Sequence, residues 1–333
     1  MDEKSAEFFE NYNLTVLDTS KTRGAFRVET DLGTKLLLPY GGSENRAVFE
    51  QKLLERLTSS GFFVDNYVAN KEGLFVTKDE FGDPFLMKDW YGGEECNVRK
   101  PEQARAAVEH LAGIHNCLSG FTISEAELPG VTQTGMYSLF EKRNRELRRV
   151  RTFIREKHRK GYFETVYINS FPEFYEKAER VTAQAKSEEI KALFAKACSE
   201  GRICHGAYTH HNLLANGPKT YATVNFDKAC IGVQITDFYL FFRKLMEKTD
   251  WNRETAEELM EAYESVRRVE PAEWRYFCLL LSYPEKFWKI TNSYYNGKKA
   301  WIPEKTTEKL LAVKEQERAR EALLSEVIRR YCV

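Results

Sequence analysis

Residues 203–216 read Ile-Cys-His-Gly-Ala-Tyr-Thr-His-His-Asn-Leu-Leu-Ala-Asn. The two leucines near the end of this stretch predict a short buried strand, directly after a loop that carries histidines, a glycine and an asparagine. Residues 223–227 follow as Thr-Val-Asn-Phe-Asp, an apolar run that ends on polar side chains.

The first stretch resembles the catalytic loop of protein kinases, which is His-Arg-Asp, four residues, and then Asn. Aminoglycoside and choline kinases use His-Gly-Asp at the same spacing. His205, Gly206 and Asn212 match, whereas Ala207 stands in the position of the aspartate. In the family that carboxylate orients the attacking hydroxyl and receives its proton. The resemblance therefore implies a kinase-type loop without its catalytic base.

The second stretch resembles the metal loop of the same superfamily, an apolar residue followed by Asp, Phe or Trp, and Asp. Asn225 replaces the first aspartate, and Asp227 retains the later one. Asparagine is a neutral ligand, whereas a hard cation that bridges phosphates favours carboxylates. Asn212 and Asn225 together would bring no negative charge to Mg²⁺. These two asparagines and Asp227 are the degenerate metal positions.

The N-terminal region departs from the kinase pattern too. A phosphate-covering loop normally contains several glycines, but the turn-rich loop predicted at residues 18–24 has one. Leu38 or Pro39 stands where the third strand should carry a lysine. Lys35 is an odd number of residues from Leu38 and is predicted on the opposite face. Glu50, on the next predicted helix, is the candidate glutamate that would pair with that lysine.

Hydrophobic periodicity divides the chain into two parts. Residues 1–91 predict strands around one helix, and residues 92–333 predict a mostly helical part that contains the degenerate loops at 202–235. Gly92-Gly93 is a candidate hinge. The predicted fold class is α+β, a protein kinase-like fold with a small antiparallel β-sheet lobe and a large helical lobe. The predicted strands include residues 14–17, 25–30, 35–40, 62–69, 74–77 and 84–90, and the predicted helices include 136–160, 272–295 and 304–331.

Three further segments resemble one branch of this superfamily, the CotS-like spore coat proteins of endospore-forming bacteria. Residues 86–96 (LMKDWYGGEEC) resemble their linker between lobes, and residues 107–121 (AVEHLAGIHNCLSGF) resemble their next helix. Residues 281–290 (LSYPEKFWKI), with Tyr294-Tyr295 and Trp301, resemble their C-terminal signature.

The resemblance covers about residues 14–302. It implies a kinase-like fold, a place in the spore coat, and other spore coat proteins as partners. Within the linker segment, Lys88 and Asp89 join Glu50 as candidate residues for a nucleotide site.

Composition excludes several classes of protein. The chain has 333 residues, 42% hydrophobic and 30% charged, with a formal net charge of zero. These values are typical of a globular chain and give no indication of nucleic acid as a partner. The N-terminus lacks the pattern of a signal peptide, and no apolar run is long enough to span a bilayer, which predicts synthesis in the cytoplasm. Seven cysteines without a CxxC pair predict reduced thiols.

Three sets of residues leave alternatives open. His205, His210 and His211 form a candidate metal cluster, but adjacent histidines are expected to point apart and no carboxylate is placed by motif to complete a set. Residues 141–160 hold ten Lys/Arg and three Glu, which suits a docking helix or a solvated one. Aromatic residues are dense near the C-terminus and predict mainly core, with some available for coat assembly. They are Trp274, Tyr276, Phe277, Tyr283, Phe287, Trp288, Tyr294, Tyr295 and Trp301.

Three functions are compatible with these patterns. The favoured one is a pseudokinase-type coat protein that needs no cofactor, because the base, a metal ligand, the lysine and the glycine loop are all missing. The alternative is a small-molecule phosphotransferase that uses ATP and Mg²⁺, in which Asp227 holds the metal and Asp237 or a histidine acts as base. A cleft that binds a nucleotide or another ligand without catalysis is the third.

Overall fold

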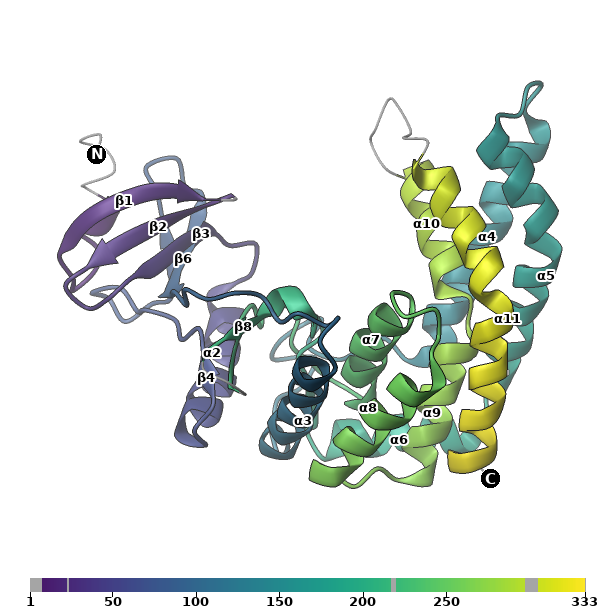
Figure 1. Ribbon diagram of the computed structural model, residues 1–333. Coiled ribbons are helices and arrows are strands. Elements are labelled where there is room, and N and C mark those ends of the chain that lie inside the picture. The colour runs from purple at the N-terminus through teal and green to yellow at the C-terminus, as the bar shows by residue number, and fades with distance from the viewer. Residues whose placement is uncertain (1–7, 23, 217–219, 297–304, 333) are drawn as a thin grey trace. The chain divides into compact units, whose positions relative to one another are not determined.

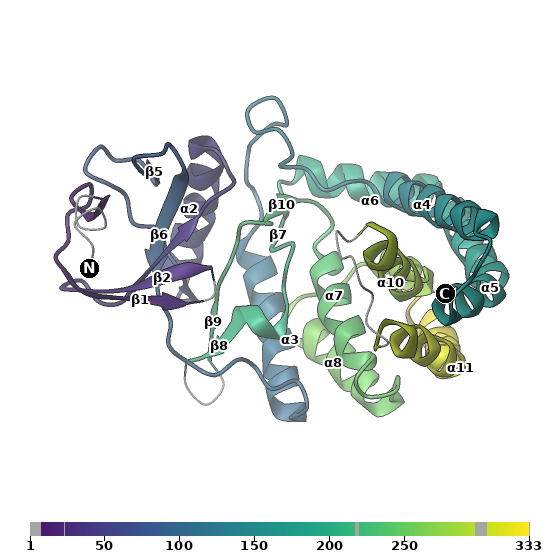
Figure 2. The same ribbon diagram turned by 90° about the horizontal axis from the view of Figure 1, so that it is seen from above.

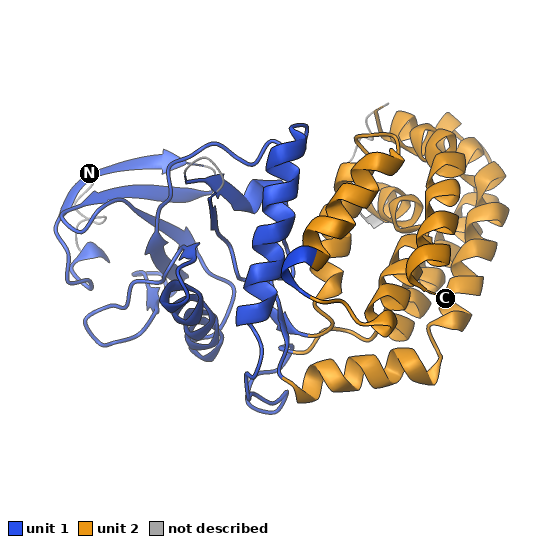
Figure 3. Ribbon diagram, turned by 60° about the horizontal axis from the view of Figure 1, so that its bottom comes forward, with its two compact units in different colours: residues 1–131, 201–231, 265–267 blue, residues 132–200, 232–264, 268–333 orange. Residues whose placement is uncertain are grey.

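The computed structural model describes residues 8–22, 24–216, 220–296 and 305–332. These residues form two compact units, shown in different colours in Figure 3. Unit 1 comprises residues 1–131, 201–231 and 265–267, and unit 2 comprises residues 132–200, 232–264 and 268–333. The lobe boundary expected at residues 91 and 92 stays a prediction, because the compact units follow a different division.

A five-stranded antiparallel sheet forms the N-terminal part of unit 1, in the order β1-β2-β3-β6-β5. Strands β1, β2, β3 and β6 are labelled in Figure 1, and β5 is labelled in Figure 2. Its strands are β1 Val16–Thr22, β2 Ala25–Thr30, β3 Lys35–Pro39, β5 Val76–Lys78 and β6 Pro84–Asp89. The register pairs Leu37 with Met87 and Leu38 with Leu86. Because neighbouring residues of a strand point to opposite faces, these pairs belong to two different cores.

Helix α2 (Glu44–Ser59) covers one face of this sheet. Ser43 caps the helix by accepting a hydrogen bond from the backbone amide of Arg46. Ala47 of the helix packs against Leu86, in a cluster that also holds Tyr40, and Figure 2 shows α2 beside β6. The opposite face packs Leu37 and Met87 against aromatic residues of the N-terminal segment.

A second, three-stranded sheet of unit 1 brings distant segments together, in the order β4-β9-β8. Strand β4 (Phe63–Val64) runs parallel to β9 (Tyr221–Thr223), which pairs antiparallel with β8 (Leu213–Ala215). The rest of unit 1 includes α3 Pro101–Cys117, β7 Ile203–Cys204, the 3-10 turn η1 His210–Asn212 and β10 Cys230–Ile231. The loop segments singled out by the sequence are all attached to this sheet.

Unit 2 is built from helices around an aromatic core. Tyr167 and Phe174 stack on Phe287 with ring centroids 5.2 and 4.6 Å apart. Part of the basic segment is used within this unit, since Arg143 pairs with buried Glu285 at 3.2 Å. The helices are α4 Met136–Glu156, α5 Tyr162–Gln184, α6 Glu188–Ser199, α7 Ile235–Met246, α8 Arg253–Val266, α9 Pro271–Ser282, α10 Glu285–Asn296 and α11 Lys305–Tyr331.

Several predicted boundaries are wrong for identifiable reasons. The turn-rich loop expected at residues 18–24 is mostly strand β1, because its polar residues pair with β2 on an exposed edge. The helix expected over residues 272–295 is two helices, since Pro284 cannot continue the first one. Only Phe63–Val64 of the strand expected at 62–69 is extended in a sheet.

The aromatic core prediction is largely confirmed. Trp274, Tyr276, Phe277, Tyr283 and Phe287 are all buried, and Tyr294 and Tyr295 are partly buried. Trp301 lies outside the described residues. The described helices include none with the length and apolar character needed to cross a membrane.

Candidate functional site

His205 supports the backbone of the degenerate catalytic loop. It is fully buried, and its Nδ1 accepts a hydrogen bond from the amide of Ala207 at 3.2 Å. That contact leaves the proton on Nε2, which lies 3.2 Å from the carbonyl oxygen of Val224. His205 therefore fastens the catalytic loop to the start of the metal loop.

Gly206 holds the same two loops close together. Its φ is +76°, and a Cβ atom there would lie 2.0 Å from the carbonyl oxygen of Lys228. Both the left-handed backbone and the close approach exclude a larger residue. Next to it, Ala207 presents a methyl group where a catalytic base would stand, and its carbonyl oxygen accepts from Asn212 Nδ2 at 2.9 Å.

Asn212 and Asn225 are hydrogen-bonded to each other. Asn225 adopts φ +67°, a conformation that asparagine tolerates better than most residues. Its Nδ2 donates to Asn212 Oδ1 at 2.9 Å. The structure thus brings together the two predicted metal positions, but as partners of each other.

The ammonium group of Lys88, on strand β6, is the third member of the network formed by Asn212 and Asn225. Lys88 Nζ lies 2.7 Å from Asn225 Oδ1 and 2.7 Å from Asp65 Oδ2. Asp65 Oδ2 also accepts from the backbone amide of Asn225 at 2.9 Å. Because Lys88 and Asp65 are 5% and 1% exposed, the pair is shielded from water and its interactions are strong.

This network fixes the orientation of both asparagine amides. An ammonium can only donate, so the oxygen of Asn225 must face Lys88 and its nitrogen must face Asn212. Asn212 then accepts with its oxygen and donates with its nitrogen to the carbonyl of Ala207. The amide oxygens that would have to serve as metal ligands both hold a donor from the protein.

The sequence patterns only partly anticipated this arrangement. Lys88 was a candidate for the nucleotide site, and the register places it opposite Leu36 of β3. Cross-strand partners share a face, so the cation is supplied by the strand next to the one where a lysine was expected. Asp65 was not singled out, because no motif marks it. Its position directly after β4, which pairs with β9, was visible only in the fold.

Among the described residues, no lysine pairs with Glu50. Glu50 is fully buried and accepts from the hydroxyls of Tyr40 and Tyr67 at 2.9 and 2.7 Å. Burial, reinforced by the charge of Glu50, raises the pKa of both tyrosines well above the ordinary value. Arg46, one turn earlier on α2, is 2.5 Å from Glu50 Oε1.

Arg46 also ties α2 to the metal loop. Its guanidinium donates to the carbonyl oxygens of Ala229 at 2.5 Å and Asp227 at 3.3 Å. Glu50 thus pairs with an arginine that hydrogen-bonds to backbone carbonyl groups. In the kinase pattern the corresponding glutamate pairs with a lysine that binds phosphate. Lys35 and Asp89 form a separate pair at 2.6 Å across β3 and β6.

Asp227 is the carboxylate of the metal loop that remains accessible. Its side chain is 49% exposed and lies 3.3 Å from Lys228 Nζ. Asp237, the alternative base, is fully buried in the first turn of α7 and belongs to unit 2. His110 lies against β9 with Nε2 2.8 Å from Thr223 Oγ1, and burial lowers the pKa of its imidazole to about 4, so it is neutral at pH 7.

The expectation about the adjacent histidines was wrong. His210 and His211 lie in η1 with ring centroids 3.9 Å apart. A carboxylate does reach them, since Glu95 Oε2 is 2.6 Å from His211 Nδ1. Glu95 comes from the linker segment, which no motif connected to these histidines.

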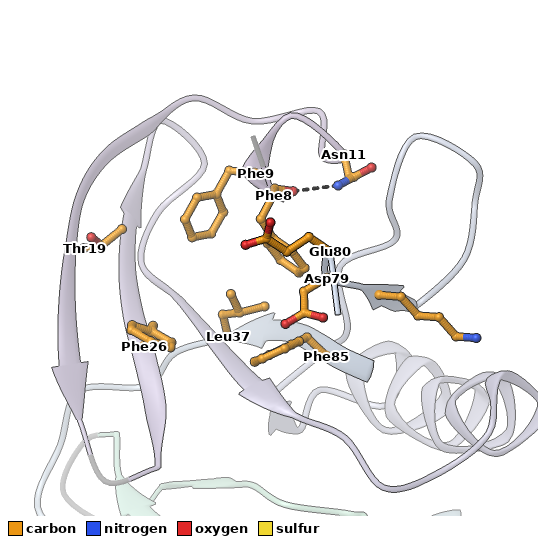
Figure 4. A pocket seen from close by; sticks show the side chains of 10 residues that line it. Phe8, Phe9, Asn11, Thr19, Phe26, Leu37, Asp79, Glu80 and Phe85 are labelled. Carbon is orange, nitrogen blue, oxygen red and sulfur yellow. Dashed lines mark hydrogen bonds between the residues drawn. The ribbon is translucent and has the colours of Figure 1, made fainter. Parts of the chain in front are cut away.

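A cavity of about 510 Å³ lies elsewhere in unit 1, on the sheet face opposite α2 (Figure 4). Leu37, Phe85 and Phe26 line it from three strands, and Phe8 lines it from the N-terminal segment. Asp79 and Glu80 add negative charge. The cavity includes none of the site residues that the sequence indicated.

Comparisons with known proteins agree with the fold and with the resemblance. Among solved structures, the chain is similar to an aminoglycoside phosphotransferase from Alicyclobacillus acidocaldarius, with a TM-score of 0.84, 17% identity, and 98% and 96% of the two chains covered. It is also similar to a spectinomycin phosphotransferase in complex with ADP and spectinomycin (TM-score 0.64, 10% identity, 96% of each chain). A microcompartment-associated aminopropanol kinase gives a TM-score of 0.60 at 14% identity, over 97% of each chain.

At these identities the likeness establishes the fold alone, and it confirms the predicted α+β, protein kinase-like class. No curated protein matches the chain. The family model described as "Spore coat putative kinase YutH" matches residues 5–327, which is nearly the whole sequence. The chain therefore belongs to the YutH family of spore coat proteins.

Proposed function

We propose that this chain is a pseudokinase-type protein of the spore coat, which keeps the kinase-like fold as a scaffold for binding other coat proteins and does not transfer phosphoryl groups. The observation that carries the proposal is the contact of Lys88 Nζ with Asn225 Oδ1 at 2.7 Å. The protonated lysine takes up one of the two lone pairs of the Asn225 oxygen and places a positive charge where a metal ion would have to bind, and each asparagine oxygen already has a donor from the protein.

Charge supports this reading. Mg²⁺ gives up its water reluctantly and is usually held by one or two carboxylates together with substrate phosphates. In the loops of this chain, positions 212 and 225 supply amides, and a Mg²⁺ ion near Asn225 would be repelled by the buried ammonium of Lys88. Asp65, the carboxylate at the network, is already compensated by that ammonium.

The chemistry of the reacting hydroxyl independently supports the pseudokinase proposal. Phosphoryl transfer relies on positioning and on neutralising charge, with a carboxylate to receive the proton of the nucleophile. Ala207 offers a methyl group, and His205 uses both ring nitrogens to hold the backbone. Loss of base and metal ligand removes two independent contributions to catalysis.

The family supports a location in the spore coat and a role among its proteins. The alternative, an active small-molecule phosphotransferase, draws on the names of the structural neighbours and on the accessible carboxylate of Asp227. In that case Asp227 would hold a metal with ATP, and the protein would turn over nucleotide.

Nucleotide turnover separates these two functions. We expect the purified full-length chain to show no ATP hydrolysis and no ATP–ADP exchange above a heat-denatured control, with Mg²⁺ and Mn²⁺ tested separately. The Asp227→Ala variant should behave as the unmodified chain does, since no metal is held there. Turnover that disappears in the Asp227→Ala variant would reject the pseudokinase proposal and establish the phosphotransferase.

A further inference from the structure

Three potential metal ligands converge where the linker meets the catalytic loop. Glu95, His210 and His211 each offer one ligand atom, and these atoms all lie within 4.8 Å of one another. The Glu95 carboxylate and the His211 ring are already in contact at 2.6 Å. We propose that Glu95, His210 and His211 form a binding site for a transition-metal ion, Zn²⁺ in the first instance.

The backbone holds the two contributing segments in place. On one side of Glu95, the carbonyl oxygen of Glu94 accepts from the amide of Ala215 at 2.8 Å. On the other side, the amide of Cys96 donates to Leu213 O at 2.9 Å. Strand β8 begins directly after the turn that carries both histidines. The main chain therefore presents the ligands before any metal binds, which reduces the entropic cost of assembling them.

Distances fit a zinc site after small side-chain movements. Bonds of about 2.1 Å in a tetrahedral site put ligand atoms ~3.4 Å apart. Atoms now up to 4.8 Å apart must approach by about 1.4 Å at most to reach that spacing, and the Glu95 and His211 atoms, now 2.6 Å apart, must separate by about 0.8 Å. Side chains of Glu95 and His211 are 51% and 61% exposed, so rotation about their χ angles meets little resistance. Three protein ligands leave a fourth position for water.

Ligand chemistry selects the type of ion. Two imidazole nitrogens with one carboxylate suit Zn²⁺, and also Cu²⁺ and Ni²⁺ by the general order of affinities, whereas Mg²⁺ and Ca²⁺ require oxygen ligands. Asn212 and Asn225, the degenerate magnesium positions, are not among these three ligands and are hydrogen-bonded to each other. The zinc site does not depend on the proposed function. A bound ion would clamp the linker to the catalytic loop.

Zinc titration of the untagged full-length chain at pH 7.5, in competition with a chromophoric chelator, tests the site. We expect one equivalent to bind. Glu95→Gln, His210→Ala and His211→Ala should each weaken binding by about tenfold or more. His158→Ala removes an exposed-loop histidine outside the cluster and should leave the affinity unchanged.

Two results would overturn the inference. The first is that the unmodified chain binds no more zinc than the Glu95→Gln/His210→Ala/His211→Ala triple variant does. The other is unchanged affinity in Glu95→Gln, since the linker carboxylate is what joins the two segments into one site. Circular dichroism and thermal melting of each variant establish that it is folded, which substitutions at exposed or partly exposed side chains should permit.

Discussion

Replacing Lys88 with methionine is expected to lower the free energy of unfolding by about 3–5 kcal/mol, because it leaves a buried charge without its partner. Methionine keeps the apolar stem of the side chain but removes the ammonium. Asp65 would then be an uncompensated carboxylate at 1% exposure. Its Oδ1 atom already has no hydrogen-bond partner among the described residues. Denaturant unfolding at pH 7, followed by circular dichroism and tryptophan fluorescence, measures the loss.

Lys35→Met is the matched control, because it removes a second lysine–aspartate pair of unit 1, the one between β3 and β6. Asp89 keeps 33% of its side chain exposed, so water can replace the lysine and the loss should be about 1 kcal/mol or less. Adding Asp65→Asn to Lys88→Met removes the stranded charge and should recover more than half of the loss. Equal losses for Lys88→Met and Lys35→Met would contradict a buried network centred on Lys88.

Replacing Gly206 with alanine is expected to cost about 3 kcal/mol or more. Two effects combine at this position. An alanine pays about 1–2 kcal/mol for the left-handed conformation, and its Cβ would lie 2.0 Å from the carbonyl oxygen of Lys228. A backbone atom cannot rotate away, so the catalytic and metal loops would have to separate. Equilibrium unfolding of the variant measures the total effect.

Two other glycines of unit 1 serve as control positions that distinguish backbone strain from steric collision of the added Cβ atom. Gly120 has φ +77° and no atom within 4 Å of the place a Cβ would take, so Gly120→Ala should cost only the backbone strain, about 1 kcal/mol. Gly41 has neither positive φ nor a close neighbour, and Gly41→Ala should change stability by about 0.5 kcal/mol or less. If Gly206→Ala were no worse than Gly120→Ala, the close packing of the two loops would be refuted.

Spacing along the chain was enough to predict the loop framework. His205, Gly206, Asn212 and Asn225 kept their intervals, and the structure places Asn212 directly before β8 and Asn225 just after β9, two adjacent strands of one small sheet. Those intervals depend on local chain geometry, which sequence records directly. The kinase-like fold class followed from the same framework and from the change between strand-like and helical periodicity.

Partners that come from distant segments could not be predicted. Asp65 reaches Asn225 only because β4 and β9 pair in parallel, and Glu95 reaches His211 only because the linker lies along β8. Neither pairing leaves a periodic pattern. The contacts of Lys88 with Asp65 and Asn225 could not be predicted for the same reason. The β3–β6 register decides which face of the sheet carries Lys88, and the fold of unit 1 brings its two partners to that face.

Nucleotide affinity with and without Mg²⁺ tests the central claim most directly, namely that the Lys88 ammonium takes the place of a metal ion at Asn225. Isothermal titration calorimetry of the full-length chain with ATP, once in buffer with Mg²⁺ and once in buffer with EDTA, measures the ATP affinity with and without the metal ion. The account predicts that Mg²⁺ brings no gain in affinity and that Asn225→Ala leaves this unchanged. A gain of about tenfold or more with Mg²⁺ that is lost in Asn225→Ala would contradict it.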